Sequence, residues 1–228
     1  MRKGRSLREI APKGCSIVWS RRARGLEVLF PEEARYVSGA CQKRIRDFAM
    51  GRYCARVAME ELGMRGEPIP STASRAPYWP EGVVGSISHT AGFAAALLGS
   101  ARDYASLGLD CQQVEHGRIS SGMAKLILAP GEDEHLQETR QFEDMSREEL
   151  LTLVFSAKEA LYKCLNPLVK KFFGFHCAEI ICIDSRDGSF RIRLSQSLSK
   201  DFQEGHEMQG KFCLLEDVLS VSLALAAR

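Results

Sequence analysis

Three charged side chains lie in apolar segments of the chain, where an isolated charge is costly. Asp110 ends an apolar strand-like segment, Glu159 has apolar residues on both flanks of a predicted helix, and Lys163 follows four positions later. A carboxylate in such surroundings needs a cation or hydrogen-bond donors. Asp110 could cap a turn, and Lys163 could form an ordinary i,i+4 salt bridge with Glu159. Two carboxylates from different elements are also sufficient to hold Mg²⁺, which prefers oxygen ligands and keeps several waters.

A basic residue interrupts the apolar stripe of another helix. Apolar residues recur at steps of three and four between positions 38 and 62, which predicts an amphipathic helix that ends at Gly63. Arg52 occupies one position of that stripe. Its aliphatic stem could snorkel from the edge of the stripe, or its guanidinium could face a cleft and bind an anion. The pattern alone leaves both readings open.

The remaining segments supply the elements that must position these side chains. Ser146-Arg147-Glu148-Glu149 has the form of a capping box and predicts a second long helix to about Leu165, ended by Pro167. Residues 66–82 are rich in Pro, Ser and Gly and predict an ordered loop. Alternating patterns predict strands at 83–88 and 93–99, turned around Gly92, and at 105–111, 177–183, 190–194, 211–215 and 219–226, with a turn at 184–188. Both halves therefore combine a long helix with antiparallel strands, which indicates the α+β class.

Composition restricts the classes of function. The chain has 228 residues, enough for one large domain or two smaller ones, and a net charge of +2 with dispersed basic residues, so nucleic acid is not an expected partner. No apolar stretch approaches the roughly 20 residues that span a bilayer, so a membrane role is not expected. The eight cysteines form no CxxC pair and are expected to be reduced core thiols. No long apolar run follows the basic N-terminus, and we expect a cytoplasmic protein.

Three separated segments together resemble a known signature. They are Gly85-Ser86-Ile87-Ser88-His89-Thr90, Leu107-Gly108-Leu109-Asp110-Cys111-Gln112 and Phe155-Ser156-Ala157-Lys158-Glu159-Ala160-Leu161-Tyr162-Lys163. Each is a weak match by itself, but their order and spacing resemble the Sfp/EntD-type 4′-phosphopantetheinyl transferases. The resemblance implies transfer of 4′-phosphopantetheine from coenzyme A to a serine of an apo carrier protein, with Mg²⁺ and release of 3′,5′-ADP.

The resemblance also implies a metal site and a proton acceptor. Asp110 and Glu159 match the metal-binding acids of the family, and Glu159 would accept the serine proton. Most members carry a second acid two residues after the Asp, where this chain has Gln112. An amide carbonyl can still ligate Mg²⁺ but brings no charge, so weaker metal binding or a different ion preference is expected.

The same resemblance implies a set of coenzyme A contacts. Lys163 would stabilise the departing 3′,5′-ADP, with Lys158 near the phosphates, and Ser88 and His89 would belong to the segment that binds a coenzyme A phosphate. His89 taken alone would more often be a structural histidine.

Further phosphate ligands are implied in the segment 43–52, Lys-Arg-Ile-Arg-Asp-Phe-Ala-Met-Gly-Arg, which resembles the family's KRxxxFxxGR. Arg44 and Arg52 would bind the ribose 3′-phosphate. Related sequences often carry a basic residue near the start of the loop before Trp79, where this chain has only small residues before Arg75, which is a candidate for phosphate or adenine contact.

For the fold, the resemblance implies two similar α+β subdomains, residues 1–103 and 104–228, in a pseudo-twofold arrangement with coenzyme A in the cleft between them. A monomer is expected from family size. The carrier would dock on residues 117–136, with Met123, Leu126, Ile127 and Leu128 as anchors, unless these are core residues of an intervening helix. Siderophore, other nonribosomal peptide, polyketide and fatty-acid carriers are all compatible.

Two other functions stay open at this point. A coenzyme A-binding module that lost transfer is suggested only by Gln112. A metal-dependent phosphohydrolase is permitted by the acid pair alone, and it would release 3′,5′-ADP without a carrier.

Overall fold

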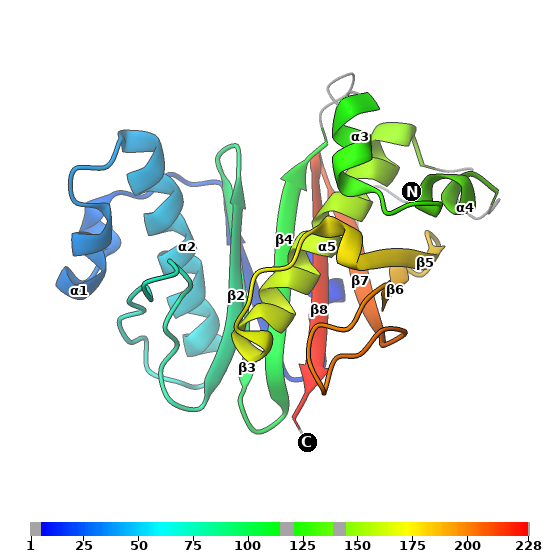
Figure 1. The fold of residues 1–228 in the computed structure, drawn as a ribbon. Coiled ribbons are helices and arrows are strands. Elements are labelled where there is room, and N and C mark those ends of the chain that lie inside the picture. The colour runs from blue at the N-terminus through cyan, green and yellow to red at the C-terminus, as the bar shows by residue number, and fades with distance from the viewer. Residues whose placement is uncertain (1–5, 115–120, 139–144, 228) are drawn as a thin grey trace.

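Two antiparallel sheets form the framework of the molecule. The computed structural model describes residues 6–114, 121–138 and 145–227. One sheet has three strands in the order β1-β3-β2, and the other has five in the order β4-β8-β7-β6-β5. Figure 1 shows β2 and β4 side by side in the middle of the molecule, with α2 on one side and α5 on the other. The predicted α+β class is confirmed.

The three-stranded sheet and its helix come from the first part of the chain. The elements are the 3₁₀ turns η1 (Leu7–Ile10), η2 (Leu26–Val28) and η3 (Arg35–Val37), the helices α1 (Pro31–Ala34) and α2 (Gln42–Glu61), and the strands β1 (Ser16–Ser20), β2 (Val83–Thr90) and β3 (Phe93–Ser100). Helix α2 packs on β3 and β1 through a buried cluster that includes Ala55, Ala58 and Met59. The helix ends where expected, because Gly63 adopts the left-handed conformation with φ of 73°.

The five-stranded sheet carries the second long helix. The elements are β4 (Tyr104–Gln113), α3 (Ser121–Ile127), α4 (Glu132–Glu138), α5 (Arg147–Val169), η5 (Phe175–Cys177), β5 (Ala178–Asp184), β6 (Ser189–Leu194), β7 (Glu207–Leu215) and β8 (Val218–Ala226). All the predicted strands are present, most of them longer by one or two residues at an end. Helix α5 lies across β4 and β8, so residues on one of its faces are pressed against the strand that carries Asp110.

The structure confirms the predicted start of α5 but not its predicted end. The capping box is formed: Ser146 Oγ accepts from the Glu149 amide, and the Glu149 carboxylate accepts from the Ser146 amide. The predicted end at Pro167 is wrong, because the helix continues to Val169. Proline removes only one backbone donor, and the Lys170 amide still donates to the Asn166 carbonyl over 2.8 Å. The helix ends when Lys170 turns left-handed.

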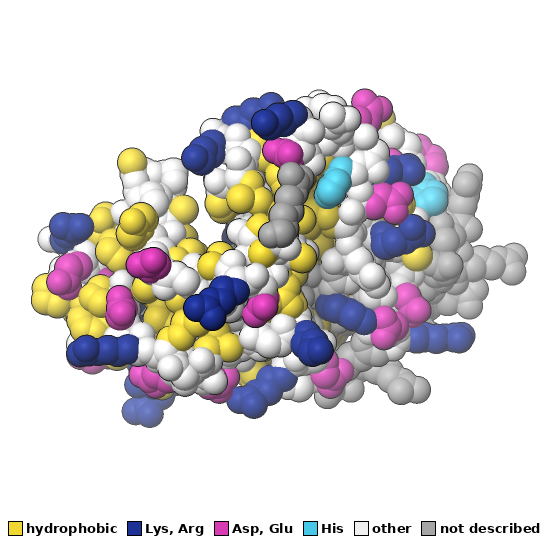
Figure 2. Space-filling view, turned by 90° about the horizontal axis from the view of Figure 1, so that it is seen from below, with side chains coloured by type: hydrophobic (Ala, Val, Ile, Leu, Met, Phe, Trp, Pro, Cys, Tyr) yellow, Lys and Arg dark blue, Asp and Glu magenta, His cyan; other side chains and the backbone are white. Residues whose placement is uncertain are grey.

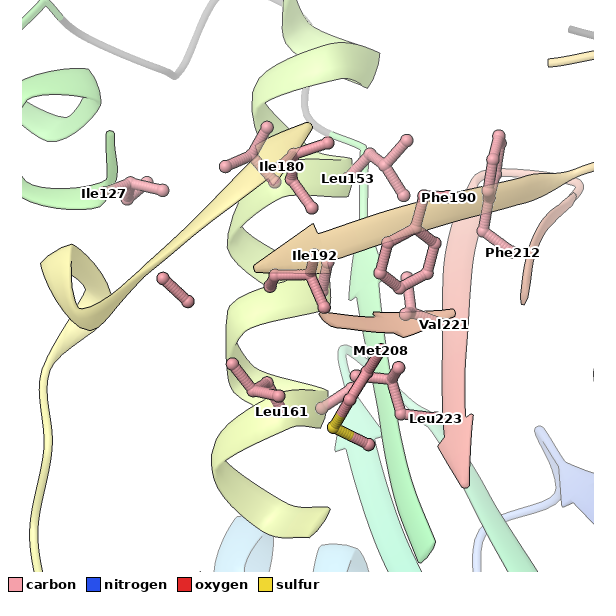
Figure 3. Close-up of a cluster of buried hydrophobic side chains, with 14 of the residues drawn as sticks. Ile127, Leu153, Leu161, Ile180, Phe190, Ile192, Met208, Phe212, Val221 and Leu223 are labelled. Carbon is pink, nitrogen blue, oxygen red and sulfur yellow. The ribbon is translucent and has the colours of Figure 1, made fainter. Parts of the chain in front are cut away.

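The larger core lies between α5 and the inner face of the five-stranded sheet. Figure 3 shows Leu153 and Leu161 of α5 facing Ile180, Ile192 and side chains from β7 and β8. This core anchors α5 along its length. The helix therefore holds its polar residues at fixed positions relative to β4.

Some expectations about the chain as a whole meet the structure directly. All eight cysteines are free thiols, and five of them are buried; Cys41 is exposed, against the expectation of a core position. Within the described ranges, none of the helices has the length and apolarity needed to cross a membrane. Figure 2 shows Lys and Arg side chains dispersed among acidic and apolar ones on the face seen from below. The division at residue 103 and the pseudo-twofold relation stay predictions.

Candidate active site

Asp110 is a buried carboxylate at the centre of a hydrogen-bond network. It lies on β4 and is 2% exposed. Its Oδ1 accepts from Lys163 Nζ at 2.7 Å and Ser88 Oγ at 2.9 Å, and its Oδ2 accepts from Gln112 Nε2 at 2.9 Å and Ser156 Oγ at 3.0 Å. Four donors from three elements therefore fix the orientation of this carboxylate.

Lys163 pairs with Asp110 rather than with Glu159. Its ammonium also donates to the Leu109 carbonyl at 3.0 Å and to Ser88 Oγ at 3.1 Å, so all three donors are engaged. The ordinary i,i+4 salt bridge considered from the sequence is thus not the ion pair that the structure contains. Its side chain remains 28% exposed, so the ammonium is fixed but still reachable from outside.

Glu159 is the half-buried acid that faces this network from α5. Burial raises its pKa above the ordinary value, the Asp110 carboxylate raises it further, and the Lys163 ammonium opposes the increase. The two carboxylates are therefore close enough to repel one another. Unlike Asp110, Glu159 bears negative charge that the neighbouring donors do not fully offset.

Gly108 allows the two acids to approach. A Cβ atom at this position would lie 2.0 Å from the backbone carbonyl oxygen of Ala160, so only glycine permits α5 to pack this closely on β4. Ala160 immediately follows Glu159, and Gly108 precedes Asp110 by two residues. The close contact of helix and strand thus sets the separation of the two carboxylates.

The oxygen donors at this point suit a hard divalent cation. Within residues 6–114, 121–138 and 145–227, no group of three His, Cys, Asp or Glu side chains could hold a metal ion. The donor set is therefore two carboxylates, with Gln112 beside them. Because Gln112 uses its amide nitrogen toward Asp110, its carbonyl oxygen is left for a ligand. Two mutually repelling carboxylates and an amide oxygen fit a cation that completes its shell with water.

His89 joins this cluster to the N-terminal helix. Its Nδ1 lies 3.8 Å from Asp47 Oδ2 on α2. Burial lowers the pKa of His89, Asp47 opposes the shift, and the positive charges of Lys163 and Arg44 lower the pKa further. The ring therefore lies within electrostatic reach of both long helices, and its side chain is 40% exposed.

Arg44 and Arg52 share one aromatic ring. The Cζ atoms of Arg52 and Arg44 lie 4.3 Å and 5.7 Å from the centroid of the buried Phe48. Arg52 is 4% exposed, its Nε donates to the Ile69 carbonyl at 2.7 Å, and its Nη2 donates to Ser71 Oγ at 3.0 Å. Burial lowers its pKa to about 10. The snorkelling interpretation is wrong for Arg52, because the guanidinium itself is buried and hydrogen-bonded.

The charged groups of two further predicted site residues, Arg75 and Lys158, form no hydrogen bond or ion pair with Asp110, Glu159 or Lys163. Arg75 is exposed, with φ of 67°, at the tip of a loop closed by the Ser71–Pro77 bridge. Lys158 is 3% exposed, and its ammonium contacts Glu132 at 2.5 Å and the Ile127 carbonyl at 2.8 Å. A direct contact of the Lys158 ammonium with phosphate is therefore not supported, because that group is committed to a buried ion pair.

An apolar cavity of about 210 Å³ opens beside Glu159. Its lining includes Tyr162, Phe172, Phe173 and Phe175. Tyr162 and Phe173 pack with ring centroids 5.0 Å apart, which gives the cavity a rigid aromatic wall. An uncharged, flexible chain is the kind of group that this lining accommodates.

Asp110, Glu159 and Lys163 form an acid cluster, and the sequence did not indicate a fourth member, Ser156. Ser156 is completely buried and donates to Asp110. It precedes Glu159 by three positions and Lys163 by seven, so all three residues lie on one face of α5. That spacing was available in the sequence, but a serine on a helix carries no hydrophobic or charge signal to single it out.

Comparisons with known proteins identify the family of the chain. Residues 32–99 match the model of the 4′-phosphopantetheinyl transferase N-terminal domain, and residues 106–216 match that of the 4′-phosphopantetheinyl transferase superfamily. The 4′-phosphopantetheinyl transferase Svp of Streptomyces mobaraensis is 38% identical over 170 residues, which cover 74% of this chain and 67% of that protein. The chain belongs to the 4′-phosphopantetheinyl transferase superfamily.

Further relatives support the same assignment. The 4′-phosphopantetheinyl transferase Npt of Nocardia iowensis is 35% identical over 72% of this chain and 73% of its own length. Enterobactin synthase component D of Salmonella typhi is 32% identical over 64% of this chain and 58% of its own length. This chain is thus a 4′-phosphopantetheinyl transferase, which moves the phosphopantetheine group of coenzyme A to carrier proteins.

Proposed function

We propose that Asp110, Glu159 and Lys163 carry out this transfer with a divalent cation, Mg²⁺, and that 3′,5′-ADP is released. The observation that supports the proposal is their convergence: the strand β4 and the helix α5 bring two repelling carboxylates and a fixed ammonium together. His89 and Arg44, from the other half of the chain, lie within electrostatic reach. A coenzyme A pyrophosphate is the group that matches such a mixed set of charges.

Asp110 and Glu159 would hold the cation, with the Gln112 carbonyl as a neutral third ligand. The two oxygens of Asp110 already accept four hydrogen bonds, so Asp110 would exchange one of them for the cation. When bound, Mg²⁺ supplies charge neutralisation on the pyrophosphate oxygens. The serine hydroxyl of the carrier attacks the β-phosphorus while Glu159, directly or through a water, accepts its proton. A serine oxygen–phosphorus bond forms, and the bond to the bridging oxygen of 3′,5′-ADP breaks.

Lys163 stabilises the charge that develops on the departing 3′,5′-ADP. All three of its donors are engaged in the present arrangement, two of them with Asp110 and Ser88. Exchange of one of these bonds for a phosphate oxygen keeps the ammonium in place throughout the step. Ser88 therefore acts on the phosphates through Lys163 and Asp110.

The remaining basic side chains are proposed to contact the phosphates and the adenine of coenzyme A. Arg44 and Arg52 bind the ribose 3′-phosphate, and His89 binds a phosphate between them and Lys163. Arg75, at the tip of its loop, is a candidate for adenine or phosphate contact. Coenzyme A then lies in the cleft between two subdomains, residues 1–103 and 104–228, related by a pseudo-twofold axis.

The apolar cavity beside Glu159 receives the pantetheine arm in this proposal. The arm is uncharged and flexible, and the aromatic wall formed by Tyr162 and Phe173 leads away from the acids. Lys158 also lines the cavity, although its ammonium donates to Glu132.

The carrier is proposed to dock next to α3. Leu126 is 70% exposed, whereas Ile127 and Leu128 are buried and belong to the core, as the alternative interpretation of this segment had it. The side chain of Met123 lies outside the described residues. A siderophore-assembly carrier is a natural first candidate, since one relative is named an enterobactin synthase component. A cytoplasmic monomer is part of the same proposal.

Intact-mass analysis of carriers tests the proposal. The purified protein is incubated with coenzyme A, Mg²⁺ and a panel of apo carriers from siderophore, nonribosomal peptide, polyketide and fatty-acid systems. Glu159→Gln is compared with Glu60→Gln, a matched change at an exposed acid near the end of α2 and outside the proposed docking segment 117–136. We expect a phosphopantetheinyl mass gain with one 3′,5′-ADP per modified carrier, lost only in Glu159→Gln.

Other results would contradict specific parts of the proposal. Undiminished transfer by a folded Glu159→Gln variant would refute the base assignment. 3′,5′-ADP released without a carrier would indicate hydrolysis. Coenzyme A binding without transfer to any carrier would favour the binding-module alternative.

A further inference from the structure

A buried carboxylate, Glu33, is linked through hydrogen bonds to Arg52, the arginine proposed to bind phosphate. Glu33, on the short helix α1, is completely buried. It accepts from Arg56 Nη1 at 2.8 Å and 2.9 Å, from the Phe30 amide at 3.0 Å and from the Ile69 amide at 2.9 Å. A buried charge is tolerated only when it is paired and hydrogen-bonded, and here it is both. Its position is therefore tightly determined.

Ile69 transmits this position to Arg52. Its amide donates to Glu33, and its carbonyl accepts from Arg52 Nε at 2.7 Å. Its side chain is completely buried, and Pro68 and Pro70 on either side restrict the backbone. Movement of the Glu33 carboxylate would therefore displace the carbonyl that holds Arg52.

Arg52 is left with one guanidinium nitrogen for a ligand. Nε and Nη2 are bound by Ile69 and Ser71, and Phe48 covers the plane. Among the described residues, Nη1 has no hydrogen-bond partner, and it is not a fully buried atom that lacks one. With two nitrogens fixed, the direction of the third is fixed as well, so the ordering cost is met before an anion binds.

Charge acts in the same direction as geometry. Burial disfavours the cationic form of Arg52, and the Glu33 carboxylate is the strongest influence that favours it. Arg56 and Arg44 disfavour it by like-charge repulsion. Glu33 thus helps keep a strongly buried guanidinium charged among other cations.

We infer that Glu33 is a positioning residue for recognition of the ribose 3′-phosphate, acting through Ile69 on Arg52. The inference rests on the proposed role of Arg52. It assigns a function to a carboxylate that is remote from the acid cluster and touches no substrate. Its distinctive consequence is discrimination between coenzyme A and 3′-dephospho-coenzyme A, because only the former carries the phosphate that Arg52 would bind.

Steady-state kinetics with the two substrates test the inference. We expect Glu33→Gln to raise KM for coenzyme A by about tenfold, the value of one well-aligned hydrogen bond to a charged group, with kcat little changed. KM for 3′-dephospho-coenzyme A should be unchanged. The matched control is Glu32→Gln, an exposed acid of the same helix, which should leave both constants unchanged.

Further variants keep the inference falsifiable. Ser71→Ala removes the Nη2 partner of Arg52 without disturbing a buried charge, and it should lower the preference for coenzyme A even if Glu33→Gln folds poorly. If Glu33→Gln and Ser71→Ala impair both substrates equally or leave the preference intact, the positioning role is overturned. Arg52→Ala distinguishes failure of the proposed phosphate role from failure of the inference. If Arg52→Ala keeps the preference for coenzyme A over 3′-dephospho-coenzyme A, the phosphate role of Arg52 is refuted. If Arg52→Ala loses this preference but Glu33→Gln keeps it, only the inference about Glu33 is refuted.

Discussion

Lys158 and Glu159 are neighbours on α5, but their charged groups lie in two regions that differ in how well charge is compensated. Lys158 enters a closed ion pair: Glu132 accepts from Lys158, from the Ala129 amide and from the Ile180 amide, and both side chains are 2% exposed or less. Glu159 enters an open cluster, where Asp110 is fully hydrogen-bonded but Glu159 repels it. In the region of Lys158 the charges are paired and connect α4, α5 and β5. In the region of Glu159 the neighbouring donors do not fully compensate the negative charge of this residue.

This difference explains why charge and burial alone did not identify function. Glu132 and Glu159 both lie among apolar residues, and each has a lysine from α5 nearby, Lys158 for Glu132 and Lys163 for Glu159. Only the balance of donors distinguishes them: three donors satisfy Glu132, whereas the pKa of Glu159 is raised. An acid that the protein itself does not neutralise is the better candidate for a metal or a proton.

The largest expected effect is on the open cluster. Glu159→Gln should lower the rate of transfer by about 100- to 10,000-fold, since it removes the proposed proton acceptor and metal ligand. The pKa of Glu159 is raised in the folded protein, so its ionised form at pH 7 opposes folding. The metal-free variant should therefore unfold at the same or a higher urea concentration. A variant as unstable as one lacking Glu132 would contradict the comparison.

The closed pair should respond in stability instead. Glu132→Gln leaves the Lys158 ammonium buried without its counterion, and the free energy of unfolding should fall by about 3–5 kcal/mol. Urea titration measures this change, with Glu134→Gln on the same helix as the control. Turnover per folded molecule should stay within a few-fold of the unmodified protein. A stable variant with abolished transfer would show that Glu132 belongs to the catalytic region.

Adding an acid sharpens the contrast. Gln112→Glu should lower the Mg²⁺ concentration for half-maximal activity by about three- to tenfold, because it converts the proposed neutral ligand to a charged one. Without metal, the added negative charge beside Asp110 should lower the melting temperature, and saturating Mg²⁺ should reverse this loss. Unaltered metal dependence would remove Gln112 from the ligand set.

The smallest effect concerns pH and His89. Because the pKa of His89 is lowered in the folded protein, the unfolded chain binds more protons between the folded pKa and the ordinary value near 6.5. Its contribution to stability is therefore present above pH 6.5 and declines as pH falls through the folded pKa. His89→Gln should reduce the loss of melting temperature between pH 7.5 and about 5.5. An identical slope would show that His89 is not held in its neutral form.

The predictability of the fold and of the site differed for a physical reason. Helix and strand periods follow from local side-chain spacing, so α2, α5 and every strand except the short β1 (Ser16–Ser20) were predicted, with ends in error by a few residues. The partners of buried charges lie far apart in sequence: Lys163 pairs with Asp110 from 53 positions away, and Lys158 with Glu132 from 26. The spacing within α5 indicated Glu159 as the partner of Lys163. Because α5 packs against β4, the actual partner is Asp110.

By itself, the sequence determined the α+β class, the capping box of α5, the glycine stop of α2 and the family resemblance, because each depends on residue types within a short segment. Only the tertiary structure decided which charges are satisfied. It buried Arg52 against the Ile69 carbonyl, turned Lys158 toward Glu132 and, through the absence of a Cβ at Gly108, brought Glu159 beside Asp110. Desolvation and its compensation depend on every element packed around a group, and no local pattern contains that information.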